Sequence, residues 1–172
     1  VVGAFNQILN DTSWGELDYL IIDMPPGTGD IQLSLAQSVP VTGAVIVTTP
    51  QDVALLDAKR GIEMFRKVQV PILGVVENMG LHICSQCGHS EHIFGEGGAD
   101  RIAYAYDVEV LGSLPLDGKI RAQCDAGTPA VAAEPNSKVS QIYGQIALRI
   151  SAQLAGIGKP GSDMPSISVS DD

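Results

Sequence analysis

Four short apolar runs, rich in β-branched residues, constrain the fold of this chain more than any other feature. Each is apolar at nearly every position instead of alternating, which is the pattern of a strand buried on both faces. The runs are Tyr19–Asp23, Ala44–Thr49, Ile72–Asn78 and Val110–Pro115. Helical crossovers between such strands cover both faces of a parallel sheet. The sequence therefore predicts an α/β fold, with a parallel sheet and helices on both faces.

Helical patterns lie between and after these runs. One helix is expected from Asp52, as its N-cap, to about Val68, and another from about Asn136 to Leu154. The residues expected on the inner face of the first helix are Leu55, Leu56, Ile62 and Phe65. From residue 156 onward Gly, Pro and Ser dominate. We therefore expect one domain over residues 1–155 and a disordered tail over residues 156–172.

Charge and cysteine content narrow the function classes. The formal net charge of −10 argues against nonspecific binding to nucleic acid or anionic lipid, although a small nucleotide site stays possible. No apolar run approaches the ~20 residues of a membrane-spanning helix, so we expect no membrane association. Three cysteines, an odd number, do not resemble a disulfide framework and favour a reducing, cytoplasmic setting.

The stretch "YLIIDMPPGTGD" is the strongest indication of a ligand site at the sheet. A predicted buried strand ends in Asp23, and two prolines, Gly27 and a further glycine follow. Ligands of open α/β sheets bind beyond the carboxyl ends of the strands. An aspartate there can hold Mg²⁺ through water, and Gly27 would let a backbone N–H approach a terminal phosphate. The alternative is an ordinary Pro-Gly turn.

The stretch "CSQCGHSEH" is the second indication of function. Cys84 and Cys87 at this spacing can converge on one metal, but a zinc ion or a [4Fe–4S] cluster needs four ligands. A cluster bridging two chains would gain the missing pair by two-fold symmetry. A zinc site would add His89 and His92, although the spacing is far shorter than in zinc fingers. A redox dithiol is the third alternative, but the flanking glycines favour an exposed loop over a helix start.

Several stretches together resemble the Mrp/ApbC-type iron–sulfur cluster carrier proteins, which are P-loop ATPases related to the MinD and ParA proteins. They are "LDYLIIDMPPGTGD", "VTTPQDVALLDAKRGIEMF", "GVVENM", "CSQCGHSEHIFGEGGA" and "LGSLPLD", in that order. The resemblance extends from the N-terminus to about Leu154. Its most specific element is the Cys-x-x-Cys segment, an insertion at residues 80–98 that the positioning ATPases lack.

The resemblance implies a role for individual residues. Asp23 would be the switch aspartate near Mg²⁺, and Gly27 would belong to the loop that senses the terminal phosphate of ATP. Asn78 would read the adenine edge, for which a side-chain amide offers both a donor and an acceptor.

The resemblance also assigns a loop and a ligand pair. Pro115 and Asp117 would lie in the loop that flanks the base. Cys84 and Cys87 would hold a [4Fe–4S] cluster at a homodimer interface. The remaining cysteine, Cys124, stands alone on an expected helix and is left out of this site.

The phosphate-binding loop of this family, with its signature lysine, is missing from the sequence. Gly-Lys occurs only at Gly118-Lys119 and Gly158-Lys159, and neither is followed by Ser or Thr. The chain is therefore expected to be the C-terminal part of a P-loop domain, incomplete at its N-terminus. The resemblance also implies that a strand of the missing part would lie centrally in the sheet, between the strands at Tyr19–Asp23 and Ala44–Thr49. Because the phosphate loop supplies most of the affinity for phosphate, we expect negligible ATP hydrolysis by this chain alone.

The function expected from these features is an ATP-dependent carrier. It would hold a labile cluster as a homodimer and transfer it to apo iron–sulfur proteins. Two alternatives stay open: a zinc-stabilised interaction domain without catalysis, and a positioning ATPase of the MinD/ParA kind. A membrane-targeted positioning ATPase would end in a basic amphipathic helix, whereas this tail is rich in Ser, Pro and Asp.

Overall fold

The computed structural model describes residues 2–24, 33, 36, 39–84 and 86–157. The helices are α1 (Val2–Asp11), α3 (Asp52–Lys67), α4 (Gly98–Tyr106), α5 (Gly118–Asp125), α6 (Ala130–Ala133) and α7 (Lys138–Gly156). The strands are β1 (Ala44–Thr48), β2 (Ile72–Glu77), β3 (His82–Ile83), β4 (Ser90–Glu91) and β5 (Val110–Ser113). Among these residues, no helix combines the length and apolar character that crossing a membrane requires.

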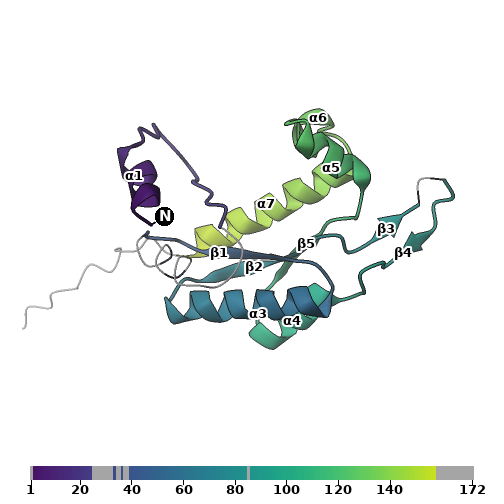
Figure 1. The fold of residues 1–172 in the computed structure, drawn as a ribbon, viewed down its shortest axis with the longest axis horizontal. Helices are drawn as coiled ribbons and strands as arrows, with labels where there is room; N and C mark the ends of the chain where they lie inside the picture. Colours follow the sequence, from purple (N-terminus) through teal and green to yellow (C-terminus); the bar gives the residue numbers. More distant parts are fainter. Residues whose placement is uncertain (1, 25–32, 34–35, 37–38, 85, 158–172) are drawn as a thin grey trace, which may run out of the picture.

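The central sheet is parallel, in the order β1-β2-β5. Helices α3 and α4 cover one face and α7 covers the other, as Figure 1 shows. Consecutive residues of β2 point to opposite faces: Val75 packs with Ile62 and Ile102, and Val76 packs with Leu111 and Ile146. The predicted α/β fold with helices on both faces is therefore confirmed.

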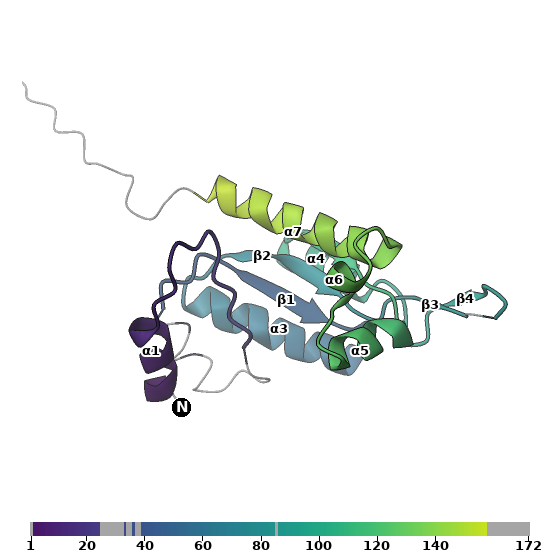
Figure 2. The same ribbon diagram turned by 90° about the horizontal axis from the view of Figure 1, so that it is seen from above.

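A separate hairpin, β3–β4, is inserted between β2 and α4. Its antiparallel strands pair His82 with Glu91 and Ile83 with Ser90. Figures 1 and 2 show that the hairpin projects beyond the body of the molecule, at the end opposite α1. The inserted Cys-x-x-Cys segment is thus carried on an arm that leaves the sheet at its carboxyl edge.

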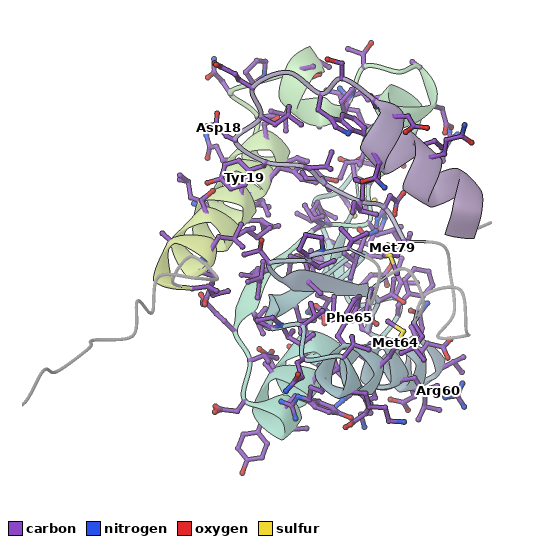
Figure 3. All side chains as sticks on the ribbon, turned by 90° about the vertical axis from the view of Figure 1, so that its left-hand side faces the viewer. Asp18, Tyr19, Arg60, Met64, Phe65 and Met79 are labelled. Atoms are coloured by element: carbon purple, nitrogen blue, oxygen red, sulfur yellow. The ribbon has the colours of Figure 1, made fainter. Side chains whose placement is uncertain are left out.

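The prediction of a strand at Tyr19–Asp23 is wrong. This segment belongs to no helix or strand, and the side chains of Tyr19 and Ile21 are 57% and 91% exposed. Figure 3 shows Tyr19 on the long connection that follows α1. In the described part of the chain β1 pairs only with β2, so this segment does not pair with the outer edge of β1. Apolar composition alone does not make a strand, because a strand needs backbone hydrogen bonds to a neighbour.

Two details of the helices also differ from expectation. Gln51 is the N-cap of α3, so that Asp52 is its first residue, and the side chain of Asp52 lies 3.2 Å from that of Arg101. Leu56 is 56% exposed rather than inward-facing. Phe65 packs on the core as predicted and points from α3 toward the sheet, whereas Arg60 points away from it (Figure 3).

The C-terminal helix is close to its prediction. Ser137 caps α7 by accepting a hydrogen bond from the backbone N–H of Ser140 at 3.1 Å. The predicted tail begins where this helix ends, and residues 158–172 of it lie outside the described residues.

Candidate functional site

Asn78 lies at the carboxyl edge of the sheet, immediately after β2. Its backbone N–H donates to the carbonyl of Thr48 at 2.7 Å, which ties the turn to the end of β1. Its side-chain Oδ1 accepts from the N–H of Met79 at 3.0 Å. Met79 adopts a left-handed conformation with φ of 59°, so the chain turns sharply here. The half-buried Asn78 side chain is therefore fixed at the edge where α/β sheets bind ligands.

Pro115 and Asp117 follow the neighbouring strand, β5. Parallel strands bring their carboxyl ends to the same edge, so these residues lie on the same side of the sheet as Asn78. Asp117 is the N-cap of α5 and accepts from the N–H of Lys119 at 2.8 Å. Three of the predicted nucleotide-site residues thus share one edge, with one Asp117 oxygen engaged in capping.

The phosphate side of the predicted site is not assembled in the same way. Asp23 is exposed and lies on the irregular segment before β1 rather than at the end of a strand. Gly27 lies outside the described residues. Asn78, Pro115 and Asp117 therefore follow strands at one edge of the sheet, whereas Asp23 follows no strand.

Glu77 is a structural residue at this edge that the sequence analysis missed. The residue is only 8% exposed. It accepts the backbone N–H of Ala99 at 2.9 Å, at the start of α4, and the hydroxyl of Ser113 at 3.2 Å, at the end of β5. A Cβ at Gly80 would lie 2.6 Å from the Glu77 carboxylate, so a larger residue there would require the Glu77 side chain to shift. An acid ending the otherwise apolar run "ILGVVE" was the available signal.

The hydrogen bond between Glu77 and Ala99 also shows what lies at the N-terminus of α4, which a glycine-rich segment precedes. A helix N-terminus attracts anions, and the glycines of "FGEGGAD" leave the N-terminus of α4 accessible to one. The carboxylate of Glu77 already occupies that position. The N-terminus of α4 is thus neutralised from within the chain, which joins β2, β5 and α4 around one buried charge.

Cys84 and Cys87 lie at the tip of the β3–β4 hairpin. Cys84 follows β3, and its backbone N–H donates to the carbonyl of His89 at 2.9 Å. Its own carbonyl accepts from the N–H of Gly88 at 2.9 Å. Gly88 has a φ of 72°, which suits glycine. The chain thus folds back tightly around the two thiols, of which Cys84 is half-buried and Cys87 exposed.

Two backbone N–H groups donate to the sulfur of Cys84. They lower the pKa of its thiol, with the N–H of Cys87 contributing most and that of Gln86 next. The Cys87 side chain and the nearby His82 act in the same direction, and burial opposes them. Donors aimed at a sulfur stabilise the thiolate, which is the form that binds metal. The tip of the hairpin therefore favours a metal-binding sulfur.

The pH dependence of Cys84 ionisation tests this arrangement. In a Cys87→Ser/Cys124→Ser variant, which keeps both backbone donors, the ultraviolet absorbance of the Cys84 thiolate should persist to a lower pH in the folded protein than in urea. The reason is that the N–H groups favour the charged form only in the folded hairpin. Equal midpoints in the two states would contradict the arrangement.

The four-ligand zinc site of one chain is not assembled. In the part of the chain that the structure describes, no three His, Cys, Asp or Glu side chains are grouped to hold a metal ion. The Nδ1 of His92 lies 2.6 Å from the carbonyl oxygen of Gly80, and His89 is exposed. Cys124 lies exposed on α5, outside the hairpin. One hairpin therefore offers two thiols.

A comparison with protein-family models shows to which family this chain belongs. Residues 1–151 match the ParA model described as NUBPL iron-transfer P-loop NTPase. The chain belongs to this family. Among curated relatives of the family, the iron-sulfur cluster carrier protein of Pseudomonas fragi is 64% identical over 148 residues, which are 86% of this chain and 52% of that protein.

Two more distant relatives also carry names that refer to iron–sulfur clusters. The iron-sulfur cluster carrier protein of Escherichia coli K12 is 60% identical over 88% of this chain and 41% of its own length. The mouse iron-sulfur cluster transfer protein NUBPL is 50% identical over 90% of this chain and 48% of its own length. The chain thus spans about half, or less, of the length of these relatives.

Solved structures confirm the P-loop NTPase fold. A nucleotide-binding protein from Archaeoglobus fulgidus, in complex with ADP and containing cobalt, is 38% identical with a TM-score of 0.69. The match covers 79% of this chain and 55% of that one. The septum site-determining protein MinD of Pyrococcus horikoshii, complexed with Mg-ADP, has a TM-score of 0.65 at 24% identity, with 92% of this chain and 58% of that chain covered. The MinD likeness shows the fold alone.

Proposed function

We propose that this chain carries a [4Fe–4S] cluster as cargo, held between two copies, and delivers it to apo iron–sulfur proteins. The observation that carries the proposal is the thiol pair at the tip of a projecting hairpin (Figure 2). The family membership and the names of its relatives support iron–sulfur transfer as the activity.

The number of ligands favours a homodimer. One hairpin supplies Cys84 and Cys87, and no third His, Cys, Asp or Glu in the described ranges joins them. A [4Fe–4S] cluster takes about four thiolates, which two hairpins related by a two-fold axis provide. The hairpin projects beyond the body of the molecule, and we propose that two tips meet there.

Exposure of the site suits a carrier more than an electron-transfer centre. Cys87 is exposed and Cys84 half-buried, so a thiol of a recipient protein can reach the cluster and exchange with these ligands. A cluster between two identical tips is also lost when the dimer separates. Both features favour release over retention.

We further propose that nucleotide binds at the carboxyl edge of the sheet and changes the hold on the cluster. Asn78, Pro115 and Asp117 would face the base, and Gly27 would approach the terminal phosphate. Asp23 would hold Mg²⁺ through water, and this ion would neutralise phosphate charge. ATP hydrolysis by this chain alone is expected to be negligible, because the sequence contains no phosphate loop with its lysine.

We place this function in the cytoplasm, where thiols stay reduced and available for the cluster. The net charge of −10 supports protein and nucleotide partners over nucleic acid.

Transfer of the cluster tests the function directly. Chain loaded anaerobically with iron and sulfide should convert an apo-ferredoxin to its holo form, followed by circular dichroism. The rate should depend on the apo-ferredoxin concentration and stay unchanged when an iron chelator is added. Conversion that the chelator abolishes would mean that iron is merely released, and would contradict a carrier. One tightly held zinc per chain and no iron uptake would favour the interaction domain instead.

A further inference from the structure

We propose that His82 and His92 are positioning residues that lock the Cys-x-x-Cys hairpin to the carboxyl edge of the sheet through their Nδ1 atoms. This inference rests on the proposed function, since it concerns how the thiols are presented to the cluster. The sequence alone suggested His92, with His89, only as a possible zinc ligand and gave His82 no role. Their contacts in the structure give them a different role.

The hairpin has little structure of its own. Each of its strands has two residues, and a two-stranded ribbon of this size is not stable in isolation. The chain leaves the sheet near Gly80 and returns at Gly97, the N-cap of α4. The orientation of the tip therefore depends on contacts at the base of the hairpin.

His92 links the two segments at the base of the hairpin. Its Nδ1 lies 2.6 Å from the carbonyl oxygen of Gly80, so the contact joins the segment that enters the hairpin to the segment that leaves it. Its Nε2 lies 3.8 Å from the carboxylate of Glu96. The segments that leave and re-enter the body are thus joined by a side chain where the strands β3 and β4 do not reach.

His82 fixes the same base to the loop after β5. Its Nδ1 lies 3.1 Å from the carbonyl oxygen of Leu116. The backbone N–H of Leu116 donates to the carbonyl of Leu81 at 2.9 Å, and His82 and Leu116 form an isolated parallel bridge. Leu116 lies between Pro115 and Asp117. The hairpin and the proposed base loop are therefore hydrogen-bonded to each other over two adjacent residues.

The hydrogen-bond chemistry fixes which imidazole atom matters. A carbonyl oxygen only accepts, so Nδ1 must carry the proton in both histidines. Asparagine places its amide N–H near the position of Nδ1, whereas glutamine places its amide near that of Nε2. An asparagine substitution should therefore preserve the contact and a glutamine substitution should remove it. A metal-ligand role for Nε2 predicts the opposite order.

Precise presentation of the thiols is the expected consequence. Four sulfurs from two tips must match one cluster to within a fraction of an ångström. Groups that orient metal ligands without touching the metal typically contribute about tenfold or more to metal affinity. A hairpin released from Leu116 and Gly80 keeps both thiols but loses their fixed orientation.

The experiment compares His82→Asn, His82→Gln, His92→Asn and His92→Gln in the whole chain. Iron and sulfide bound per chain are measured after anaerobic reconstitution at limiting iron. The asparagine variants should load like the wild type, and the glutamine variants should bind about tenfold more weakly. His89→Gln is the matched control, because His89 is exposed and joins the hairpin through its main-chain oxygen. It should load normally.

Amide exchange in the metal-free protein gives a second readout that does not need the cluster. The N–H groups of Cys84 and Gly88, both bonded within the tip, should exchange about tenfold faster in the glutamine variants and at the wild-type rate in the asparagine variants. Wild-type protein that takes up no iron would contradict the proposed function, while these exchange rates would still judge the two contacts.

Three outcomes would overturn the positioning role. Normal loading and normal exchange in all four variants would mean that the contacts do not matter. Loading kept by glutamine but lost with asparagine would identify Nε2 as a ligand. Loss in both, in proteins that unfold at the wild-type temperature, would show that a donor at the Nδ1 position is not what counts.

Discussion

Replacement of both Cys84 and Cys87 by serine is expected to abolish iron binding after anaerobic reconstitution. The wild type should bind about four iron and four sulfide ions per two chains, and the variant only background amounts. Serine keeps the size of the side chain but replaces the soft thiolate that iron–sulfur clusters require. Iron and acid-labile sulfide assays, with the visible absorption spectrum, measure the difference.

A matched control separates ligand loss from a general effect of removing thiols. Cys124→Ser changes an exposed cysteine on α5, away from the hairpin, and should leave loading unchanged. The double variant should also unfold at the wild-type temperature in the metal-free state, because both thiols lie at a projecting tip. Full loading of the double variant would remove the basis for the proposed site.

Replacement of Glu77 by alanine is expected to lower the free energy of unfolding by about 3 kcal/mol. The substitution leaves the buried N–H of Ala99 without its acceptor, next to the space once filled by the carboxylate, and it also removes the acceptor of the part-buried Ser113 hydrogen bond. Urea unfolding, followed by circular dichroism, measures the change.

Glu77→Gln is the matched control for this prediction. The amide can accept from Ala99 with its oxygen and donate to Ser113 with its nitrogen, so only the charge beside the α4 N-terminus is lost. That loss should cost about 1 kcal/mol or less. Equal destabilisation by alanine and glutamine would mean that the charge, rather than the pair of hydrogen bonds, joins β2, β5 and α4.

The strands and helices that pack on each other were predictable, because burial on both faces leaves a continuous apolar run. Ile72–Glu77 of β2 follows this rule. Helix α7 was predictable from a different pattern, the stripe of Ile142, Ile146 and Ile150 at helical spacing. The run at Tyr19–Asp23 is apolar like β2 but forms no strand. The apolar pattern indicates what a segment can bury, and it cannot indicate whether the segment pairs with a neighbouring strand.

The site was predictable only where residues close in sequence act together. The spacing of Cys84 and Cys87 pointed to a shared metal, and the hairpin does hold both at one tip. The contacts of Glu77 with Ala99 and of His82 with Leu116 join residues 22 and 34 positions apart. No local pattern encodes such contacts, which arise from the adjacent parallel strands β2 and β5.

The measurement that tests the central claim most directly is the native mass of the anaerobically reconstituted protein. The account predicts a species of two chains with about four iron and four sulfide ions, which separates into metal-free chains when the cluster is removed. A cluster or metal ion bound by a single chain would contradict it, because Cys84 and Cys87 of one hairpin would then suffice without a second copy.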